Sequence, residues 1–334
     1  MKQNQLINAL RGIGISWIVL FHYTMRYNTL FPNKSYEFPI IFNNGKIGVT
    51  IFFIISGYLM GRYLYFEKSI GIKTSLKFFI NKYWRLWPLY AISVVLIYAI
   101  LCFYPLPSRN VNFLDFIMNF FFINHFGIPN VDGAHWFLST LISLTFLLAI
   151  FLCIRKVSVR LKFFDVYVCF CIAFFIIKHL FQLDFGFLSA FVSKWQLNFL
   201  FGVYSYMFFK GTRNRINKTL FVVLGVFCCL SNNLQGCLFI FLILASIYLE
   251  IKHLNLYNKI VSYKLMKFFI WVGNVSFCWY LIHQNIGYVF FYYLYSYMSD
   301  MPIVLILFVL SFTFISAFIL NKLIRNIPTK LFKL

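Results

Sequence analysis

Apolar runs long enough to cross a membrane recur along this chain, and short polar or basic segments separate them. An α-helix needs about 20 apolar residues to cross the hydrocarbon core of a bilayer. Among the 334 residues, 62% are hydrophobic and only 11% are charged, which excludes a water-soluble fold of this size. Because the backbone must satisfy its own hydrogen bonds in lipid, the runs are expected to be helices. The sequence therefore predicts an all-α, polytopic membrane bundle.

The basic clusters predict how the chain is threaded. Lys and Arg gather after alternate runs, and the positive-inside rule assigns these clusters to the cytoplasm, together with both termini. Residues 113–126 are apolar but too short to cross, so we expect a re-entrant or interfacial segment on the outer side, after the third span. The pattern gives one membrane domain over residues 1–334 with about ten spans, near residues 8–27, 45–65, 84–104, 135–154, 163–181, 187–209, 220–230, 237–251, 268–297 and 302–320.

The net charge of +22 does not indicate nucleic-acid binding, because the cations lie in short clusters between apolar runs. The eight cysteines lie mostly within apolar runs and have no metal-ligand spacing, so we predict neither a disulfide framework nor a metal site. The first apolar run has no small-residue cleavage site after it. We interpret it as an uncleaved first span in contact with membrane lipids.

The first span carries two ionisable side chains, Arg11 near its start and His22 eleven residues later. Eleven residues of α-helix rise roughly 16 Å and turn the chain only about 20° past three full turns. Both side chains therefore share one face, with a cation at the membrane edge and an imidazole deep in the bilayer. Such groups usually face a bundle interior or a wet cavity and mark a functional site, and imidazole transfers protons near neutral pH. The simpler explanations are an anchoring arginine and a structural histidine.

A second histidine lies in the ninth predicted span. Ser276, Tyr280 and His283 follow at positions i, i+4 and i+7, which places them in one polar stripe along a helix. Such a stripe serves either chemistry or polar packing against a neighbouring helix. The spacing favours neither over the other.

Two further clusters lie at the ends of spans. Lys82 and Arg85, at positions i and i+3, can grip phosphates at the cytoplasmic end, with Trp84 and Trp87 as stacking surfaces. An interfacial aromatic belt with positive-inside charge explains the same residues, and on spacing alone that explanation is stronger. At the predicted outer mouth of the fourth span, Asp132 and His135 can handle an acceptor hydroxyl, whereas Trp136 taken alone fits an interfacial aromatic belt.

Five stretches in chain order resemble the acyltransferase-3 family of integral membrane acyltransferases. Arg11 and His22 meet its pattern of an arginine, ten residues and a histidine. Residues 48–58 meet the family's G-V-x-x-F-F-x-x-S-G-[YF] segment. Residues 82–88 meet its R-x-x-R-[IL]-x-P segment, with Lys82 in place of the first arginine.

The two later stretches follow the same order. Residues 135–138 meet the H-x-W-F-L-type segment, one residue tighter than usual, and residues 276–283 meet S-x-x-x-Y-L-x-H. Many family members carry a glutamate pair after the former segment, whereas this chain has Leu141 and Ile142 there. No catalytic carboxylate is therefore carried over from the family.

The resemblance implies transfer of an acyl group, usually acetyl, from cytoplasmic acyl-coenzyme A to a sugar hydroxyl outside the bacterial inner membrane. The implied acceptors are O-antigen, capsule, exopolysaccharide or lipid-linked glycans, and the chain resembles the stand-alone type of the family. His22 is then the general base or the acyl carrier, and Arg11 positions the donor. Cations at the inner mouth would hold the donor phosphates: Lys82, Arg85 and Arg62. The acceptor-side or supporting residues are Asp132, His135, Trp136, Ser276, Tyr280 and His283.

Two other classes of membrane protein fit part of the pattern. A transporter or a flippase of a lipid-linked sugar also needs buried ionisable groups, but no paired Gly/Pro-broken helices mark two corresponding halves. An O-antigen polymerase or ligase would present a large outer loop with several arginines. The longest outer stretch here, about residues 105–134, holds only Arg109.

Overall fold

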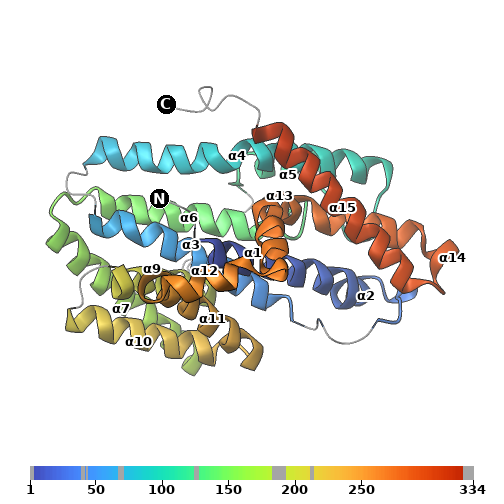
Figure 1. The fold of residues 1–334 in the computed structure, drawn as a ribbon. Coiled ribbons are helices and arrows are strands. Elements are labelled where there is room, and N and C mark those ends of the chain that lie inside the picture. The colour runs from blue at the N-terminus through green and yellow to red at the C-terminus, as the bar shows by residue number, and fades with distance from the viewer. Residues whose placement is uncertain are drawn as a thin grey trace. The chain divides into compact units, whose positions relative to one another are not determined.

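The computed structural model describes residues 4–38, 42, 44–66, 71–123, 128–182, 193–210 and 214–325. These residues form helices and no strands, which confirms the predicted all-α fold. Figure 1 labels the helices along the chain. In chain order they are α1 (Gln5–Phe21), the π-helix η1 (His22–Arg26), α2 (Tyr27–Leu30), the 3-10 helix η2 (Pro32–Lys34), α3 (Lys46–Phe66), α4 (Ile72–Phe103), α5 (Phe113–Phe120), α6 (Trp136–Leu152), α7 (Val157–Phe181), α9 (Lys194–Lys210), α10 (Arg215–Leu230), α11 (Leu234–Lys252), α12 (Leu254–Ser262), α13 (Lys264–Tyr293), α14 (Tyr295–Met298) and α15 (Pro302–Arg325).

Seven helical segments within the described residues are long and apolar enough to cross a membrane, so the chain is a multi-pass membrane protein. The seven are Gln5–Leu30, Lys46–Tyr65, Ile72–Phe103, Val157–Phe181, Leu234–Lys252, Lys264–Tyr293 and Pro302–Ile324. Three further predicted spans fall on helices with 16 or 17 residues, namely α6, α9 and α10, which are shorter than those seven. In the described part of the chain, seven of the roughly ten predicted spans therefore have the length and composition to cross a membrane. Each predicted span thus falls on a helix, although residues 187–192 of the sixth lie outside the described residues.

Several helices begin before their apolar runs. α4 begins at Ile72, twelve residues ahead of the predicted start at Trp84, so Lys73, Lys77 and Lys82 lie on a helix and not in a loop. Lysine is a good helix former, and this segment contains neither Gly nor Pro to end the helix. Hydropathy therefore located the membrane-spanning part of α4, while the helix itself continues into the basic segment.

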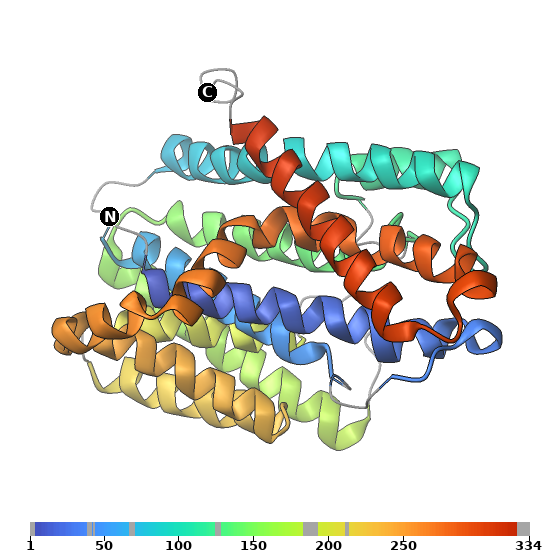
Figure 2. The ribbon, with the colours of Figure 1, turned by 45° about the vertical axis from the view of Figure 1, so that its right-hand side comes forward.

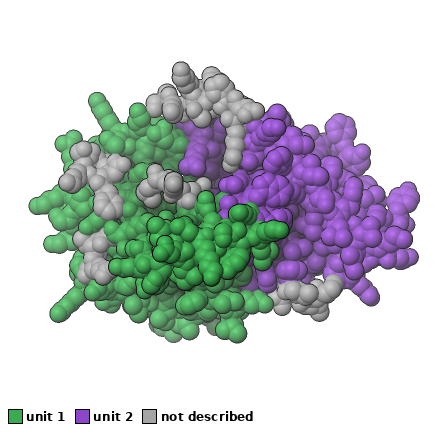
Figure 3. Space-filling view, viewed as in Figure 1, with its two compact units in different colours: residues 1–10, 49–82, 141–267 green, residues 11–48, 83–140, 268–334 purple. Residues whose placement is uncertain are grey.

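The chain divides into two compact units, coloured separately in Figure 3. Unit 1 comprises residues 1–10, 49–82 and 141–267. Within it, α3 and α9 pack with their backbones in close approach. A Cβ atom on Gly57 would meet the carbonyl oxygen of Phe199, and one on Gly202 would meet that of Ile54. Small residues at such crossings let transmembrane helices pack tightly, so this pair fixes the position of α9 against α3.

Unit 2 comprises residues 11–48, 83–140 and 268–334. In it, α15 crosses α13 obliquely (Figure 2). The buried hydroxyl of Thr313 on α15 accepts a hydrogen bond from Trp279 Nε1 at 3.1 Å, and its oxygen lies 3.1 Å from that of the Tyr23 hydroxyl. Tyr23 is the second residue of η1, and its hydroxyl donates to the carbonyl of His283 on α13 at 2.8 Å. These bonds join the first and last parts of the sequence around α13.

The short helix α5 runs back along α4 (Figure 1). Phe116 stacks on Tyr98 with ring centroids 4.4 Å apart, and Phe122 stacks on Tyr90 at 3.9 Å. Successive residues of the segment thus meet successively earlier residues of α4, while residues 124–127 lie outside the described residues. The chain then returns to the buried His135, whose ring lies 5.0 Å from that of Tyr90. The helix α5 thus turns back along α4, and whether residues 113–126 are re-entrant or interfacial stays a prediction; they are called the re-entrant segment below.

Candidate active site

His22 lies where α1 changes into the π-helix η1, and its ring faces α13 within unit 2. Its Nδ1 is hydrogen-bonded to the Tyr288 hydroxyl at 2.9 Å, and its ring centroid lies 5.1 Å from that of His283. His22 is partly exposed, whereas the next residues, Tyr23 and Thr24, are buried. Single turns of π-helix inside α-helices occur frequently at functional sites. The imidazole therefore lies against polar side chains of α13, and part of it stays accessible.

His283 is fully buried, and its hydrogen bond fixes its tautomer. Its Nδ1 lies 2.8 Å from the carbonyl oxygen of Tyr280. A carbonyl oxygen only accepts, so Nδ1 carries the proton, and in the neutral ring Nε2 presents a lone pair. Among the described residues this Nε2 has no hydrogen-bond partner. An imidazole beside His22 thus offers an unoccupied acceptor.

Arg109 is a member of this cluster that the sequence reasoning missed. Its guanidinium carbon lies 5.8 Å from the ring centroid of Tyr288, the partner of His22. Its Nη1 also lies 2.8 Å from the position that a Cβ atom on Gly133 would occupy, so the absence of a side chain there leaves it room. One feature of the sequence could have identified it. Arg109 is the only arginine in a predicted outer stretch of about 30 residues that is otherwise poor in positive charge.

Asp132 and His135 both bind the backbone of α13. His135 Nε2 donates to the carbonyl of Leu281 at 3.0 Å, and Asp132 Oδ2 accepts from the amide of Asn285 at 3.0 Å. Residues 281 and 285 are the partners that close one turn of an α-helix, so the two side chains engage the same turn. The other carboxylate oxygen of Asp132 accepts from the amide of Ala134 at 2.8 Å. The pair fixes the returning limb of the re-entrant segment against α13.

Replacing Asp132 by asparagine is expected to destabilise this contact. Both carboxylate oxygens accept from backbone amides, and an asparagine would set an NH₂ group against one of them. A buried donor left without a partner costs roughly 1–3 kcal/mol. Thermal unfolding of the purified protein in detergent measures the loss. Asp115→Asn is the matched control, because Asp115 is partly exposed on α5, and an equal effect of both variants would contradict this role.

The other predicted acceptor-side residues have structural contacts. Tyr280 donates from its hydroxyl to the carbonyl of Ala134, which ties the same limb to α13. Ser276 bonds locally to the carbonyl of Gly273 at 2.7 Å. Trp136 is the partly exposed first residue of α6. Of the polar stripe predicted on α13, His283 places its ring beside that of His22.

The predicted phosphate-binding cations fall in both units. Arg11 and Arg85 belong to unit 2 and lie close enough for their like charges to repel each other. Within the described segments, neither of them forms an ion pair with a carboxylate. Arg62 and Lys82 belong to unit 1, where both lie over the ring of Tyr63. Of these cations, Arg11 and Arg85 are adjacent and have no neutralising carboxylate among the described residues, which suits an anionic ligand.

Trp87 does not present the stacking surface that we expected of it. Its indole Nε1 donates to the carbonyl of Phe120 at 3.0 Å, and its ring packs edge-on against that of Phe120 at 5.2 Å. Trp84 in turn packs edge-on against Trp87. The two tryptophans therefore hold the end of α5 against α4.

Comparison with known proteins gives one match. A family model described as an acyltransferase domain matches residues 4–322, nearly the whole chain. No curated protein and no solved structure matches the chain. The matched region contains α1, α13 and the re-entrant segment, and so includes every residue of the cluster around His22.

Proposed function

The chain belongs to the acyltransferase-3 family of integral membrane acyltransferases, and from this we propose a specific reaction for it. It transfers an acetyl group from cytoplasmic acetyl-coenzyme A to a hydroxyl of an envelope polysaccharide or a lipid-linked oligosaccharide at the bacterial inner membrane. The observation that carries the proposal is the hydrogen-bonded pair of His22 and Tyr288, which presents a titratable imidazole at the start of η1, directly after α1. Membership in an acyltransferase family favours this chemistry over transport without reaction.

His22 acts as the general base in the proposed reaction. When Nδ1 carries the proton and donates to the Tyr288 oxygen, Nε2 keeps its lone pair and takes the proton from the acceptor hydroxyl. The hydroxyl oxygen then attacks the thioester carbonyl carbon, and collapse of the tetrahedral intermediate breaks the C–S bond. The coenzyme thiolate leaves and takes up the proton. Tyr288 thereby orients the imidazole as the third group of a nucleophile–base–orienter arrangement does.

A route through an acyl-histidine differs in one measurable respect. The acyl group would move first to His22 Nε2 and only then to the hydroxyl. Incubating the protein with labelled acetyl-coenzyme A without acceptor, then quenching, would leave label on the protein in that route. Direct transfer leaves the protein unlabelled.

Arg109 brings positive charge to the ring of Tyr288, the hydrogen-bond partner of His22. A guanidinium there stabilises the negative charge that develops on the carbonyl oxygen. Arg109→Gln is expected to lower kcat about 100-fold, the typical effect of removing one such donor. Arg109→Lys keeps the charge and is expected to retain more activity than the glutamine variant. Equal kcat values for wild type and Arg109→Gln would remove Arg109 from the mechanism.

The function itself is tested by following the acyl group. Membranes that contain the protein and an envelope glycan are incubated with acetyl-coenzyme A labelled in the acetyl group, and the glycan is recovered. We expect label in ester linkage, released by mild base, and no label with membranes that lack the protein. A flippase would change the sidedness of the lipid-linked glycan and leave it unlabelled, which would contradict the proposal.

A further inference from the structure

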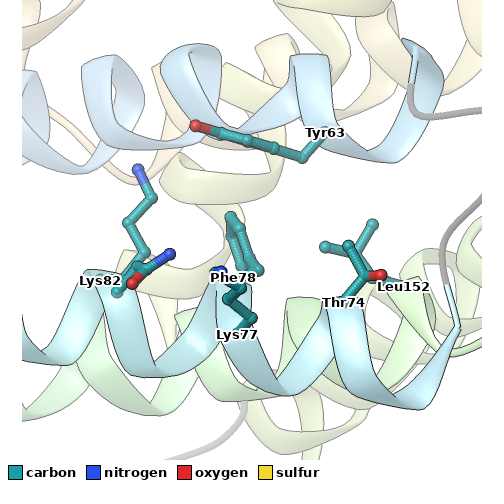
Figure 4. Close-up of a pocket in the computed structure, with 7 residues that line it drawn as sticks. Tyr63, Thr74, Lys77, Phe78, Lys82 and Leu152 are labelled. Carbon is teal, nitrogen blue, oxygen red and sulfur yellow. The ribbon is translucent and has the colours of Figure 1, made fainter. Parts of the chain in front are cut away.

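Unit 1 holds a cavity of about 230 Å³, and Lys82, one of the predicted phosphate-binding cations, is among its lining residues. It lies between the end of α3 and the start of α4, and Figure 4 shows its lining side chains. Tyr63 covers it from α3, and Leu152 at the end of α6 closes one end. The remaining lining residues come from the first three turns of α4: Thr74, Lys77, Phe78, Asn81 and Lys82.

Two aromatic rings form the apolar part of this cavity. The rings of Tyr63 and Phe78 lie 4.8 Å apart with an angle of 57° between their planes. Both side chains are only partly exposed, so their rings are held by packing and keep a face toward the cavity. Ring faces of this kind can stack on the base of a nucleotide, whichever base it carries.

The polar part of the cavity is cationic. Lys82 reaches from α4 toward Tyr63, and its Nζ lies 5.2 Å from the ring centroid of Tyr63 and 5.8 Å from that of Phe78 (Figure 4). The guanidinium carbon of Arg62 lies 4.5 Å from the Tyr63 ring centroid, and Arg62 donates to the Tyr63 hydroxyl. Lys77 is exposed at the rim. Among the described residues, the lining contains amide and hydroxyl groups but no carboxylate.

We propose that this cavity binds the nucleotide end of the coenzyme A donor, with the base against Phe78 and Tyr63 and a phosphate on Lys77 and Lys82. The inference rests on the proposed function and locates its donor site. Rings combined with cations match a nucleoside phosphate, whereas cations alone would match any anion. The volume is below the roughly 300–1,000 Å³ of pockets that enclose a whole drug-sized ligand, so it suits one ring system and not the entire coenzyme.

The sidedness of the chain agrees with this donor. The cavity lies at the basic ends of α3 and α4, which the positive-inside rule assigns to the cytoplasm, where coenzyme A thioesters are made. Asn81 and Thr74 add hydrogen-bonding groups that can read the edge of a base. In this proposal Lys82 contacts the donor phosphates, as the sequence analysis predicts. The base stacks on Tyr63 and Phe78, and not on Trp84 and Trp87.

Binding measurements on the purified full-length protein in lipid nanodiscs test the site. The probes are coenzyme A, adenosine 3′,5′-bisphosphate and adenosine. Lys77→Gln is expected to weaken the binding of the first two about tenfold, the effect of losing one charge-assisted hydrogen bond. Phe78→Leu is expected to weaken all three probes by about tenfold, because base stacking contributes to each.

Two neighbouring residues provide matched controls on the same helix. Lys73→Gln removes an exposed lysine, and Phe79→Leu removes a ring that packs on Phe146 and does not line the cavity. Both are expected to bind the probes as the wild type does. Wild-type affinities in Lys77→Gln and Phe78→Leu, or equal losses in the control variants, would overturn the site.

An anionic lipid headgroup has the same phosphate chemistry, and a second set of nanodiscs separates the two sources. Nucleotide binding that persists in phosphatidylcholine and is only screened by phosphatidylglycerol supports the donor site. Phosphatidylglycerol binding that depends on Lys77, without any nucleotide binding, overturns it. A failure of the proposed function gives a different result from a failure of this site. The cavity would then still bind nucleotide, while the glycan would stay unlabelled. An unchanged KM for acetyl-coenzyme A in active variants contradicts the site alone.

Discussion

His22→Ala is expected to lower the rate of acyl transfer by a factor of about 100 to 10,000, the usual contribution of a general base. The expected loss is in kcat more than in KM for the donor, because the imidazole is proposed to act on the proton in the transition state. The variant should still fold, since His22 is partly exposed and its one side-chain hydrogen bond goes to Tyr288. Steady-state assays with labelled acetyl-coenzyme A measure both constants.

Two further variants test whether the expected loss of activity is specific to the pair of His22 and Tyr288. Tyr288→Phe keeps the ring and removes the hydroxyl that orients Nδ1, so an intermediate loss is expected. His179→Ala is the control, because His179 is exposed on α7 in unit 1. Full activity in His22→Ala, in a preparation whose melting temperature equals that of the wild type, would remove the proposed mechanism.

Gly57→Val is expected to prevent assembly of unit 1. The branched side chain would run into the backbone of α9 at Phe199, and neither backbone can yield without separating the two helices. Overpacking of a tight contact costs about 1–3 kcal/mol and more where backbone must move. We therefore expect little monodisperse protein after extraction in detergent, and a lower melting temperature for what remains.

Gly225→Ala is the corresponding control on α10. Its added Cβ would lie 3.2 Å from the ring of Phe201, a side chain that can shift slightly, and no backbone atom stands among its nearest neighbours. Near-normal yield is expected for this variant. If Gly57→Val gave the same yield and melting temperature as Gly225→Ala, the close packing of α3 on α9 would be wrong.

Hydropathy and charge accounted for most of the fold. The runs of apolar residues predicted every long helix, because a helix in lipid needs continuous apolar length and no partner strand. The same rule identified residues 113–126 as too short to cross, and α5 indeed turns back along α4. Helix starts were wrong by several residues at α4 and α7, because lysine-rich segments continue a helix beyond the lipid-facing part.

The site was predicted only in part. Spacing along one helix placed Arg11 and His22 on a shared face, and the family resemblance drew attention to residues 276–283. Sequence gave no reason to pair His22 with Tyr288 or to bring Arg109 beside them, because these residues come from three separate segments. Asp132 and His135 were expected at an outer mouth, and the structure places both in buried contacts with one turn of α13.

The linear sequence was thus sufficient for a membrane-spanning helical chain, which depends on composition, and for its family, which depends on five short stretches in chain order. It also drew attention to one histidine, His22, because spacing within a single helix pairs it with Arg11. Which side chains meet that histidine depends on helix packing and on the path of the re-entrant segment. The same holds for the cavity beside Tyr63 and Phe78, which exists only because α3, α4 and α6 come together. Contacts between segments far apart in sequence follow no period along the chain, so tertiary structure alone establishes them.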